Sequence, residues 1–423
     1  MKVKISHLLI TLLLISCLFP RRLVLLGTYS YVIEVLIVAG VVFAKYGFKP
    51  IKWTWGKLFL IAMLFLHAMS YICHNNIKPM MYGVVAPVLI IYLLYRLVSD
   101  EEKFDYALKA ITYMFIFAAI LSIIETLTGF NLWDKLSGYD VAYAAANGYR
   151  FGMVRARGAF ETSINNGMFM LLGQGVILYC MTKYPKSILH KFAYGVVVVA
   201  TLLIMSRATI IGTVLLVLLW MFKAGMRKLP VRVFKISILI LILYGAVKLL
   251  NITFVLNFFE WIGNALAALI DSSYVDYDSN IGDSGQRLIL FAWIYEATLG
   301  HRIWGLGEYA VFSKAVNSIF IKTSIENYFL WVFFRFGFIG VGTIVLPLCG
   351  FITSLVKNDK KELKGADNKT SKLTFPGMML CTSLVYIAAN FTCAGQNDTL
   401  FFCAIIGITM AYHSMRERGV YQK

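Results

Sequence analysis

Residues 324–340 read SIENYFLWVFFRFGFIG, in which an acidic and an amide residue precede an almost wholly apolar stretch that contains one arginine. Such a stretch predicts a helix in a membrane, because about 20 apolar residues span the hydrocarbon layer. A charged side chain at the centre of that layer costs about 2.5–3.5 kcal/mol on the mildest scales. We therefore expect Glu326 and Arg335 to lie near water, to have a partner, or to serve a function.

The composition of the whole chain also predicts a membrane protein. Of its 423 residues, 59% are hydrophobic and 15% are charged, whereas a soluble domain has about a quarter charged residues. We expect an all-α polytopic membrane protein in which residues 1–423 form one integral membrane domain of about twelve transmembrane helices. The expected spans are centred near residues 12, 33, 66, 89, 117, 174, 197, 215, 241, 341, 383 and 405.

The basic residues indicate the orientation of the chain. Most of the 40 Lys and Arg residues fall on the inner-face segments of a topology with a cytoplasmic N-terminus, namely 1–5, 44–57, 96–109, 183–191, 223–235, 357–373 and 414–423. By the positive-inside rule, both termini are expected in the cytoplasm. The segment 357–373 is expected to be a solvated loop. The basic inner-face loops therefore account for the net charge of +18. No motif predicts a nucleic-acid partner.

This orientation leaves two long outer loops, at about 129–165 and about 251–325. Long connections are more often functional than short ones. The second loop contains FVLNFFEWIGNALAALI (254–270), whose apolar residues recur at roughly helical spacing. We expect short helices there, either along the membrane surface or as an additional short span.

Arginines gather on the expected outer face, where the positive-inside rule predicts few. They are Arg150, Arg155, Arg157, Arg207, Arg287 and Arg302. Such a cluster suits an anionic ligand, because the guanidinium fork matches phosphate oxygens in pairs. For any single arginine, surface charge or snorkelling is the alternative. Arg207 differs, because it sits in a short polar break between two apolar helices, LLIMSRATIIGTVLLV (202–217).

Four stretches resemble the O-antigen ligase and polymerase superfamily of bacterial envelope proteins. They are RARGAFETSINNGMFMLL (155–172), LLIMSRATIIG (202–212), GQRLILFAWIYEATLGHRIWGLGEY (285–309) and the opening stretch (324–340). Each motif is weak alone, and four in the expected order are more specific. The resemblance covers roughly residues 150 to 345, with twelve spans as its frame.

The resemblance implies a glycosyltransferase that joins glycans carried on undecaprenyl diphosphate at the outer leaflet, without a metal or other cofactor. Carried over position by position, the superfamily's motif residues fall on Arg157, Asn166, Arg207, Arg287, Trp293, Gly305 and Gly307. The ligase branch has a His before the Asn of the last motif, where this chain has Glu326. That departure favours a repeat-unit polymerase over a ligase.

Glycosyl transfer from a lipid diphosphate needs a base for the attacking hydroxyl and positive charge for the leaving diphosphate. Glu326 is the candidate base, and Arg207 and Arg287 are the candidate catalytic cations. The candidate substrate-binding residues are Arg155, Arg157, Asn166, Trp293, Arg302, Asn327 and Arg335. Alternatively, Glu326 and Asn327 only complete a helix N-terminus, and His74 or His301 is the base.

An acidic run at 272–285, SSYVDYDSNIGDSG, is the alternative metal site. Counted from Asp276, the sixth position is Ile281 and the twelfth is Arg287, where a calcium loop needs Gly and Glu. We therefore interpret the run as a polar loop before a helix, and no metal is expected.

The leading hypothesis is an inverting, metal-independent polymerase of lipid-linked polysaccharide repeat units, of O-antigen or capsule type, in a bacterial inner membrane. Its expected partners are undecaprenyl-diphosphate-linked oligosaccharide, the bilayer and a chain-length regulator protein. One alternative is a ligase that transfers finished polymer to a lipid A core. A second alternative is a twelve-helix transporter or flippase of lipid-linked sugars, which predicts two pseudo-symmetric halves.

Overall fold

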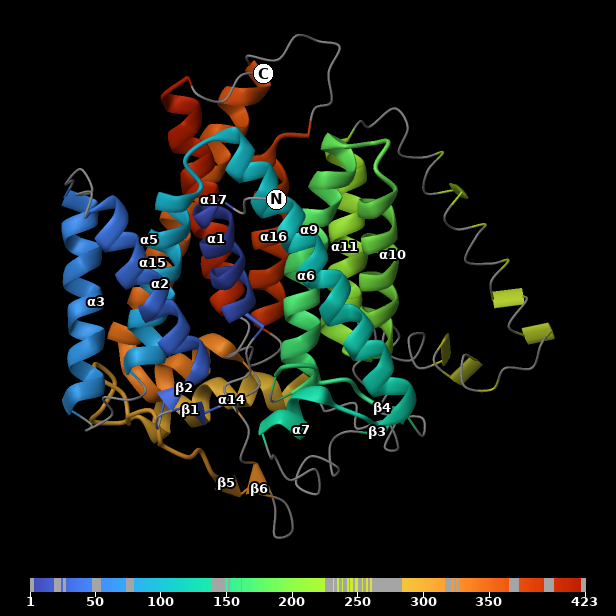
Figure 1. The fold of residues 1–423 in the computed structure, drawn as a ribbon. Coiled ribbons are helices and arrows are strands. Elements are labelled where there is room, and N and C mark those ends of the chain that lie inside the picture. Colours follow the sequence, from blue (N-terminus) through green and yellow to red (C-terminus); the bar gives the residue numbers. More distant parts are fainter. Residues whose placement is uncertain are drawn as a thin grey trace.

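The computed structural model is a bundle of α-helices (Figure 1). It describes residues 4–18, 24–25, 28–47, 55–73, 80–137, 149–150, 153–160, 162–224, 284–315, 321–322, 325, 327–364, 373–391 and 399–419, together with single residues between 231 and 260.

The helices of the described chain follow one another with few strands between them. They are α1 (Ile5–Ser16), α2 (Ser30–Tyr46), α3 (Trp55–Cys73), the π-helical turn η1 (Met81–Val85) that continues into α5 (Ala86–Leu97), α6 (Glu101–Thr128), α7 (Leu132–Ser137), α9 (Ser163–Lys183), α10 (Ile188–Leu203), α11 (Arg207–Lys223), α14 (Ser284–Ala297), α15 (Tyr328–Lys364), α16 (Phe375–Asn390) and α17 (Thr399–Glu417). Short antiparallel pairs join β1 (Val24–Leu25) to β2 (Thr28–Tyr29), β3 (Tyr149–Arg150) to β4 (Met153–Val154), and β5 (Lys314–Ala315) to β6 (Ile321–Lys322).

The predicted helical architecture is confirmed, and helices lie at the predicted span centres where the structure describes the chain continuously. The centre near residue 241 falls where only isolated residues are described. Three described helices are long and apolar enough to cross a membrane, namely Glu101–Thr128, Ser163–Lys183 and Tyr328–Lys364. Shorter apolar helices are Ile5–Ser16, Met81–Leu97, Ile188–Leu203 and Phe375–Asn390.

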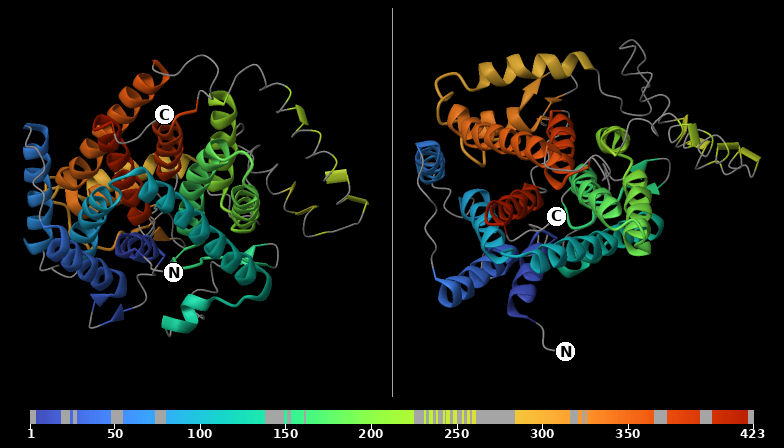
Figure 2. Two further views of the ribbon diagram at one scale, coloured as in Figure 1. Left: turned by 45° about the horizontal axis from the view of Figure 1, so that its top comes forward. Right: turned by 90° about the horizontal axis from the view of Figure 1, so that it is seen from above.

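The elements of the two predicted long loops lie toward one end of the bundle. Figure 1 shows α7, β3, β4 and α14 at this end, while the two chain termini lie toward the other. Seen along the bundle (Figure 2, right), α14 lies across its end and not parallel to its axis. The arginine-bearing segments are therefore gathered at the end of the bundle away from the termini.

The segment 357–364, predicted as part of a solvated loop, is instead the last part of α15. Lys and Glu favour helix strongly, and two acids in these turns have partners on neighbouring helices. Asp359 pairs with Lys223 of α11 (2.5 Å), and Glu362 lies 3.6 Å from Arg416 of α17. These pairs join α11, α15 and α17 at the end of the bundle opposite α14.

Helix α9 is the most enclosed of the three long apolar helices. It packs against α6, α10, α11 and α16, and its residues from 165 to 180 are buried without interruption. A helix buried all round presents no single apolar face. Glycines allow its neighbours to come close, because a methyl group at Gly173 would overlap the ring of Phe115, and one at Gly175 would overlap Thr382.

We predict that Gly175→Ala destabilises the protein, because overpacking in a closed core costs about 1–3 kcal/mol. Gly195→Ala on the adjacent helix α10 is the matched control, since nothing lies within 4 Å of its added methyl group. Thermal unfolding in detergent should show a lower midpoint for Gly175→Ala and no loss for Gly195→Ala. Equal midpoints would contradict the close approach of α9 and α16.

Candidate functional site

The backbone of residues 155–158 is held by a buried carboxylate. Glu125 lies in the last turn of α6 and is 2% exposed. Its two oxygens accept the backbone N–H groups of Arg157 (3.1 Å) and Gly158 (2.8 Å). A charge so deeply buried is tolerated when hydrogen bonds of this kind replace water. Glu125 therefore fixes the path of the RARG segment past the end of α6.

Two buried amide side chains hold the same segment. Asn131 donates from Nδ2 to the carbonyl of Gly158 (3.0 Å). Asn166 donates from Nδ2 to the carbonyl of Ala156 (3.2 Å) and to Ser122 Oγ (3.0 Å). Gly158 has φ +55°, and a Cβ there would come within 3.0 Å of the Asn166 amide, so glycine is required. The segment is thus anchored to α6 and α9.

Arg157 forms an ion pair with Asp134 of α7. The distance from Nη2 to Oδ2 is 2.5 Å, and the two side chains are only 12% and 4% exposed. Removing one partner of so buried a pair would leave an uncompensated charge. The pair therefore ties α7 to the RARG segment.

Arg155 extends from this segment to the turn between α10 and α11. Its Nε donates to the carbonyl of Ile204 (3.3 Å), and its Nη2 donates to the carbonyl of Met205 (3.4 Å). Met205 is buried and has φ 54°, a backbone conformation that side chains other than glycine disfavour. Helix α11 begins at Arg207. Arg155 and Arg207, which are 52 residues apart in the chain, therefore both lie beside the α10–α11 turn.

A broken helix forms the second part of the candidate site. Helix α15 is interrupted at Gly337, whose φ is 61° and ψ is −157°. A break in a helix leaves backbone carbonyl and N–H groups without helical partners, and residues 302–307 bind two carbonyl and two N–H groups beside this break. The bonds are Leu306 N–H to Phe334 O (3.1 Å), Gly307 N–H to Arg335 O (2.9 Å), Phe338 N–H to Arg302 O (2.8 Å) and Ile339 N–H to Ile303 O (3.2 Å).

Glycine is required on both sides of this backbone contact. A Cβ at Gly305, where φ is +75°, would overlap the backbone of Arg335. A Cβ at Gly337 would overlap the carbonyl of Arg302. The Gly-x-Gly turn expected at Gly305 and Gly307 is therefore the part of the loop that enters the break in α15.

Arg335 is neutralised and covered within the same region. Its Nη1 lies 2.9 Å from Glu308 Oε1, and its guanidinium lies 4.3 Å from the centre of the Trp331 ring. Glu308 is therefore the partner that was expected for Arg335, and it lies in the loop after α14. Arg302 stacks on Tyr295, with 3.6 Å between guanidinium carbon and ring centre. Stacking on an aromatic face favours a cation at a partly dry site.

Asn327 and Trp293 make structural contacts in the same region. Asn327 is 7% exposed, accepts the N–H of Leu330 through Oδ1 (3.0 Å) and donates to the carbonyl of Phe391 (3.0 Å). Asn327 therefore caps the N-terminus of α15, which is the structural role predicted as the alternative to substrate binding. Trp293 packs half-buried in the apolar cluster between α14 and α15.

Several predicted residues lie outside the described residues. They include Glu326, the candidate base, and also His74 and the acidic residues 272–283. Arg287 lies in the first turn of α14, and His301 lies in the exposed turn that follows this helix.

The described candidates form two groups. Arg155, Arg157, Asn166 and Arg207 surround the loop before α9 and the α10–α11 turn, whereas Trp293, Arg302, Asn327 and Arg335 surround α14 and the start of α15. The elements that carry both groups lie toward the same end of the bundle (Figure 1).

Sequence reasoning missed three carboxylates that position these arginines, namely Glu125, Asp134 and Glu308. Glu125 stands in an otherwise apolar stretch, LSIIETLTG (121–129), where an acid is costly and indicates a buried partner. The other two acids lie in loops or short helices, and nothing in their local sequence distinguishes them.

The chain is similar to the O-antigen polymerase of Salmonella muenchen, with 22% identity over 395 residues that cover 90% of this chain and 93% of that protein. No family model matches the chain. The similarity extends beyond the four motifs to nearly the full length, and it confirms the predicted resemblance to O-antigen polymerases. Together with the apolar helices, it indicates a bacterial membrane protein.

We predict that Glu125→Gln loosens the RARG segment. An amide replaces one carboxylate oxygen with an N–H donor that faces a backbone N–H, and a buried unsatisfied group costs about 1–3 kcal/mol. Glu417→Gln, at an exposed position at the end of α17, is the control. Thermal unfolding and proteolysis of the 129–162 region should both change in Glu125→Gln only. An unchanged unfolding midpoint would contradict the proposed anchoring.

We predict that Gly337→Ala disrupts the contact between α15 and residues 302–307. Its φ and the overlap with the Arg302 carbonyl together should cost at least about 2 kcal/mol. Gly350→Ala in the same helix is the control, because nothing lies within 4 Å of its methyl group. Hydrogen exchange at residues 334–339 should increase in Gly337→Ala and stay at the wild-type rate in Gly350→Ala. Unchanged protection in Gly337→Ala would refute the contact.

Proposed function

We propose that the chain polymerises lipid-linked polysaccharide repeat units at the outer face of a bacterial inner membrane. The observation that supports this most is the similarity to an O-antigen polymerase along 90% of the chain. The gathering of arginine-bearing segments at one end of a helical bundle is consistent with it (Figure 1).

In this proposal about twelve helices cross the membrane and both termini are cytoplasmic. The end of the bundle with α7 and α14 then faces the outside, and the described elements at this end border the proposed reaction chamber. Arg207 reaches it from the start of α11, and Arg155 reaches it from the RARG segment that lies against the α10–α11 turn. The positive-inside rule supports this orientation, because the basic loops then lie in the cytoplasm.

The reaction joins a growing chain on undecaprenyl diphosphate to a single lipid-linked unit. The acceptor hydroxyl oxygen attacks the anomeric carbon, the bond from that carbon to the diphosphate oxygen breaks, and the configuration inverts. Glu326 takes the hydroxyl proton. Arg207 and Arg287 stabilise the charge that develops on the departing diphosphate, which fixed guanidinium groups can do without a metal ion.

The paired arginines have a different part in this proposal. Arg157 is neutralised by Asp134, and Arg335 by Glu308, so each pair adds little net charge to the chamber. A guanidinium that is held by a carboxylate keeps donors in a fixed direction. In this proposal Arg157 and Arg335 therefore orient the substrate.

Transport is the second candidate, because a discontinuous helix such as α15 is common in transporters. In transporters the freed backbone groups line a substrate or ion path. In α15 the loop at 302–307 binds the four groups that surround Gly337. This favours a rigid joint in an enzyme over a translocation site.

We predict that Arg207→Ala and Arg287→Ala abolish long-chain polysaccharide in cells that depend on this chain. Loss of a group that stabilises developing charge lowers the rate by about 10²–10³-fold. Single repeats should accumulate on the lipid carrier, whereas free lipid-linked polymer would indicate a ligase. Arg418→Ala, at an exposed position after α17, is the control and should leave chain length unchanged.

The measurement is gel electrophoresis of the polysaccharide, with membrane insertion of each variant checked by immunoblotting. Long chains made by normally inserted Arg207→Ala and Arg287→Ala proteins would contradict the proposal.

A further inference from the structure

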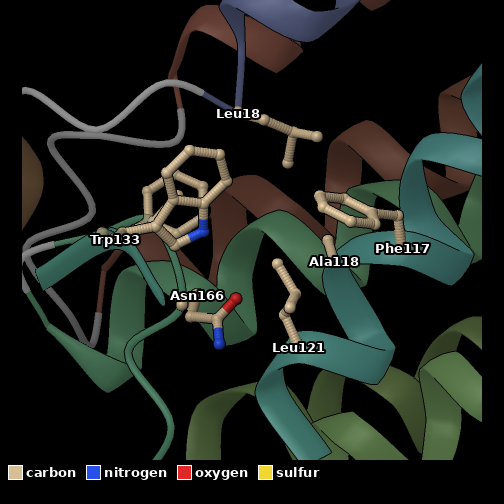
Figure 3. Close-up of a pocket in the computed structure, with 9 residues that line it drawn as sticks. Leu18, Phe117, Ala118, Leu121, Trp133 and Asn166 are labelled. Atoms are coloured by element: carbon tan, nitrogen blue, oxygen red, sulfur yellow. The ribbon is translucent and has the colours of Figure 1, made fainter. Parts of the chain in front are cut away.

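At the candidate site the described chain leaves little enclosed space. The pocket between Trp133, Leu121 and Asn166 (Figure 3) has room for about one water molecule. A larger ligand therefore meets this end of the bundle from the surface. Exposed apolar side chains of α14, next to the second group of arginines, offer such a surface.

Helix α14 carries a row of exposed apolar side chains beside its buried face. Leu290 and Ile294 are buried in the apolar cluster that joins α14 to α15. Phe291, Tyr295 and Leu299, each four positions after the last, are 49%, 50% and 69% exposed. Residues four positions apart lie on one side of a helix. These three residues, named the α14 row, therefore form one apolar strip that ends in the turn after the helix.

The α14 row lies at the depth expected for a membrane surface. Helix α14 lies across the end of the bundle, beside α15 (Figure 2, right). Its buried face contacts Leu330, Phe333 and Phe334 of α15. Because a helix rises about 1.5 Å per residue, these contacts lie within roughly 10 Å of the start of this apolar helix. An amphipathic helix parallel to a membrane inserts its apolar face by a similar depth of about 5–10 Å.

The α14 row adjoins the side of α15 that faces lipid. Helix α15 is long and apolar enough to cross a membrane, and only 22% of its most apolar part is buried within the protein. Tyr295 stacks on Phe333 with 6.5 Å between ring centres, and Phe333 contacts the ring of Phe338 at 5.0 Å. Phe338 is itself 58% exposed. Lipid that covers α15 therefore extends onto the α14 row.

Arg302 stands at the edge of this apolar surface. Its guanidinium carbon lies 3.6 Å from the centre of the Tyr295 ring, and its Nη2 donates to the carbonyl of Tyr295 (3.4 Å). The side chain is partly exposed. A guanidinium has five N–H donors, so most of them are left for a ligand, and their fork matches a phosphate. Basic and aromatic residues, here Arg302 with Tyr295 and Trp304, are typical of a protein surface at the headgroups.

We propose that α14 lies in the headgroup layer of the membrane, with the α14 row among phospholipid acyl chains and Arg302 at a phospholipid phosphate. The partner of this surface is therefore the bilayer and not a second protein. The orientation in the proposed function makes this the outer leaflet, and only the choice of leaflet rests on the proposed function. A helix held in this way keeps Arg287, in its first turn, at the membrane surface. The diphosphate of a lipid carrier lies at the same level.

Fluorescence quenching tests the depth of α14. A dansyl amino acid replaces Phe291 or Leu299 in the full-length chain, and Glu296, an exposed position of the same helix outside the row, is the control. Each protein is placed in phospholipid nanodiscs in which some lipids carry a nitroxide, either near the acyl carbonyl or at the end of the chain. We expect the nitroxide near the carbonyl to quench the two row positions about threefold more than the control, because the row inserts by only about 5–10 Å.

Equally weak quenching at all three positions would overturn the inference, because protein or water would then cover the α14 row. Stronger quenching by the nitroxide at the end of the chain would also overturn it, since α14 would then lie deep in the membrane. Size-exclusion chromatography identifies a labelled protein that fails to fold, and the other row position then carries the test.

Arg302→Gln tests the phosphate contact separately. The delipidated full-length chain is incubated with limiting phosphatidylglycerol, without any lipid-linked sugar, and native mass spectrometry measures the retained lipid. We expect the wild type and the control Arg418→Gln to retain about fivefold more lipid than Arg302→Gln, because a charge-assisted hydrogen bond to phosphate is lost. Equal retention by the three proteins would overturn the placement of Arg302 at a phospholipid phosphate.

Neither measurement involves polymerisation, so failure of this inference is distinguishable from failure of the proposed function. A chain whose α14 row is quenched but that never joins two units keeps the interfacial helix and loses the polymerase. A chain that joins units while its α14 row stays unquenched does the reverse.

Discussion

The carboxylate of Glu125 determines the position of the first group of arginines. Buried at the end of α6, it accepts two consecutive backbone N–H groups of the RARG segment. Arg157 then meets Asp134, and Arg155 can reach the carbonyls of the α10–α11 turn. Because a buried acid must be satisfied by protein groups, one costly residue defines the local backbone path.

The second group depends on a reciprocal arrangement of backbone groups. Beside the break at Gly337, four backbone groups of α15 form hydrogen bonds with residues 302–307. This contact holds Glu308 close to Arg335 and lets a charged side chain stand in an apolar helix. Both groups of arginines thus lie where the backbone leaves regular secondary structure. In each case the backbone groups there form hydrogen bonds with a segment that is distant in sequence.

Hydropathy predicted the helical class and the positions of the described apolar helices, because an apolar segment is a local property of the sequence. The resemblance to the superfamily picked out Arg157, Arg207, Gly305 and Gly307 as motif residues, and their part in a reaction stays a prediction. Local sequence patterns could not predict which charged residues pair with one another. Asp134 and Glu308 are chosen by tertiary contacts, and the continuation of α15 to Lys364 depends on pairing with Lys223 and Arg416.

Reconstitution tests the account most directly. Purified full-length chain in lipid nanodiscs is incubated with synthetic undecaprenyl-diphosphate-linked repeat units, with and without a chelator. We expect a ladder spaced by one repeat unit, insensitive to chelator, with one undecaprenyl diphosphate released for each glycosidic bond formed. Repeat units that are never joined, although the protein is folded in the nanodiscs, would contradict the proposed polymerase.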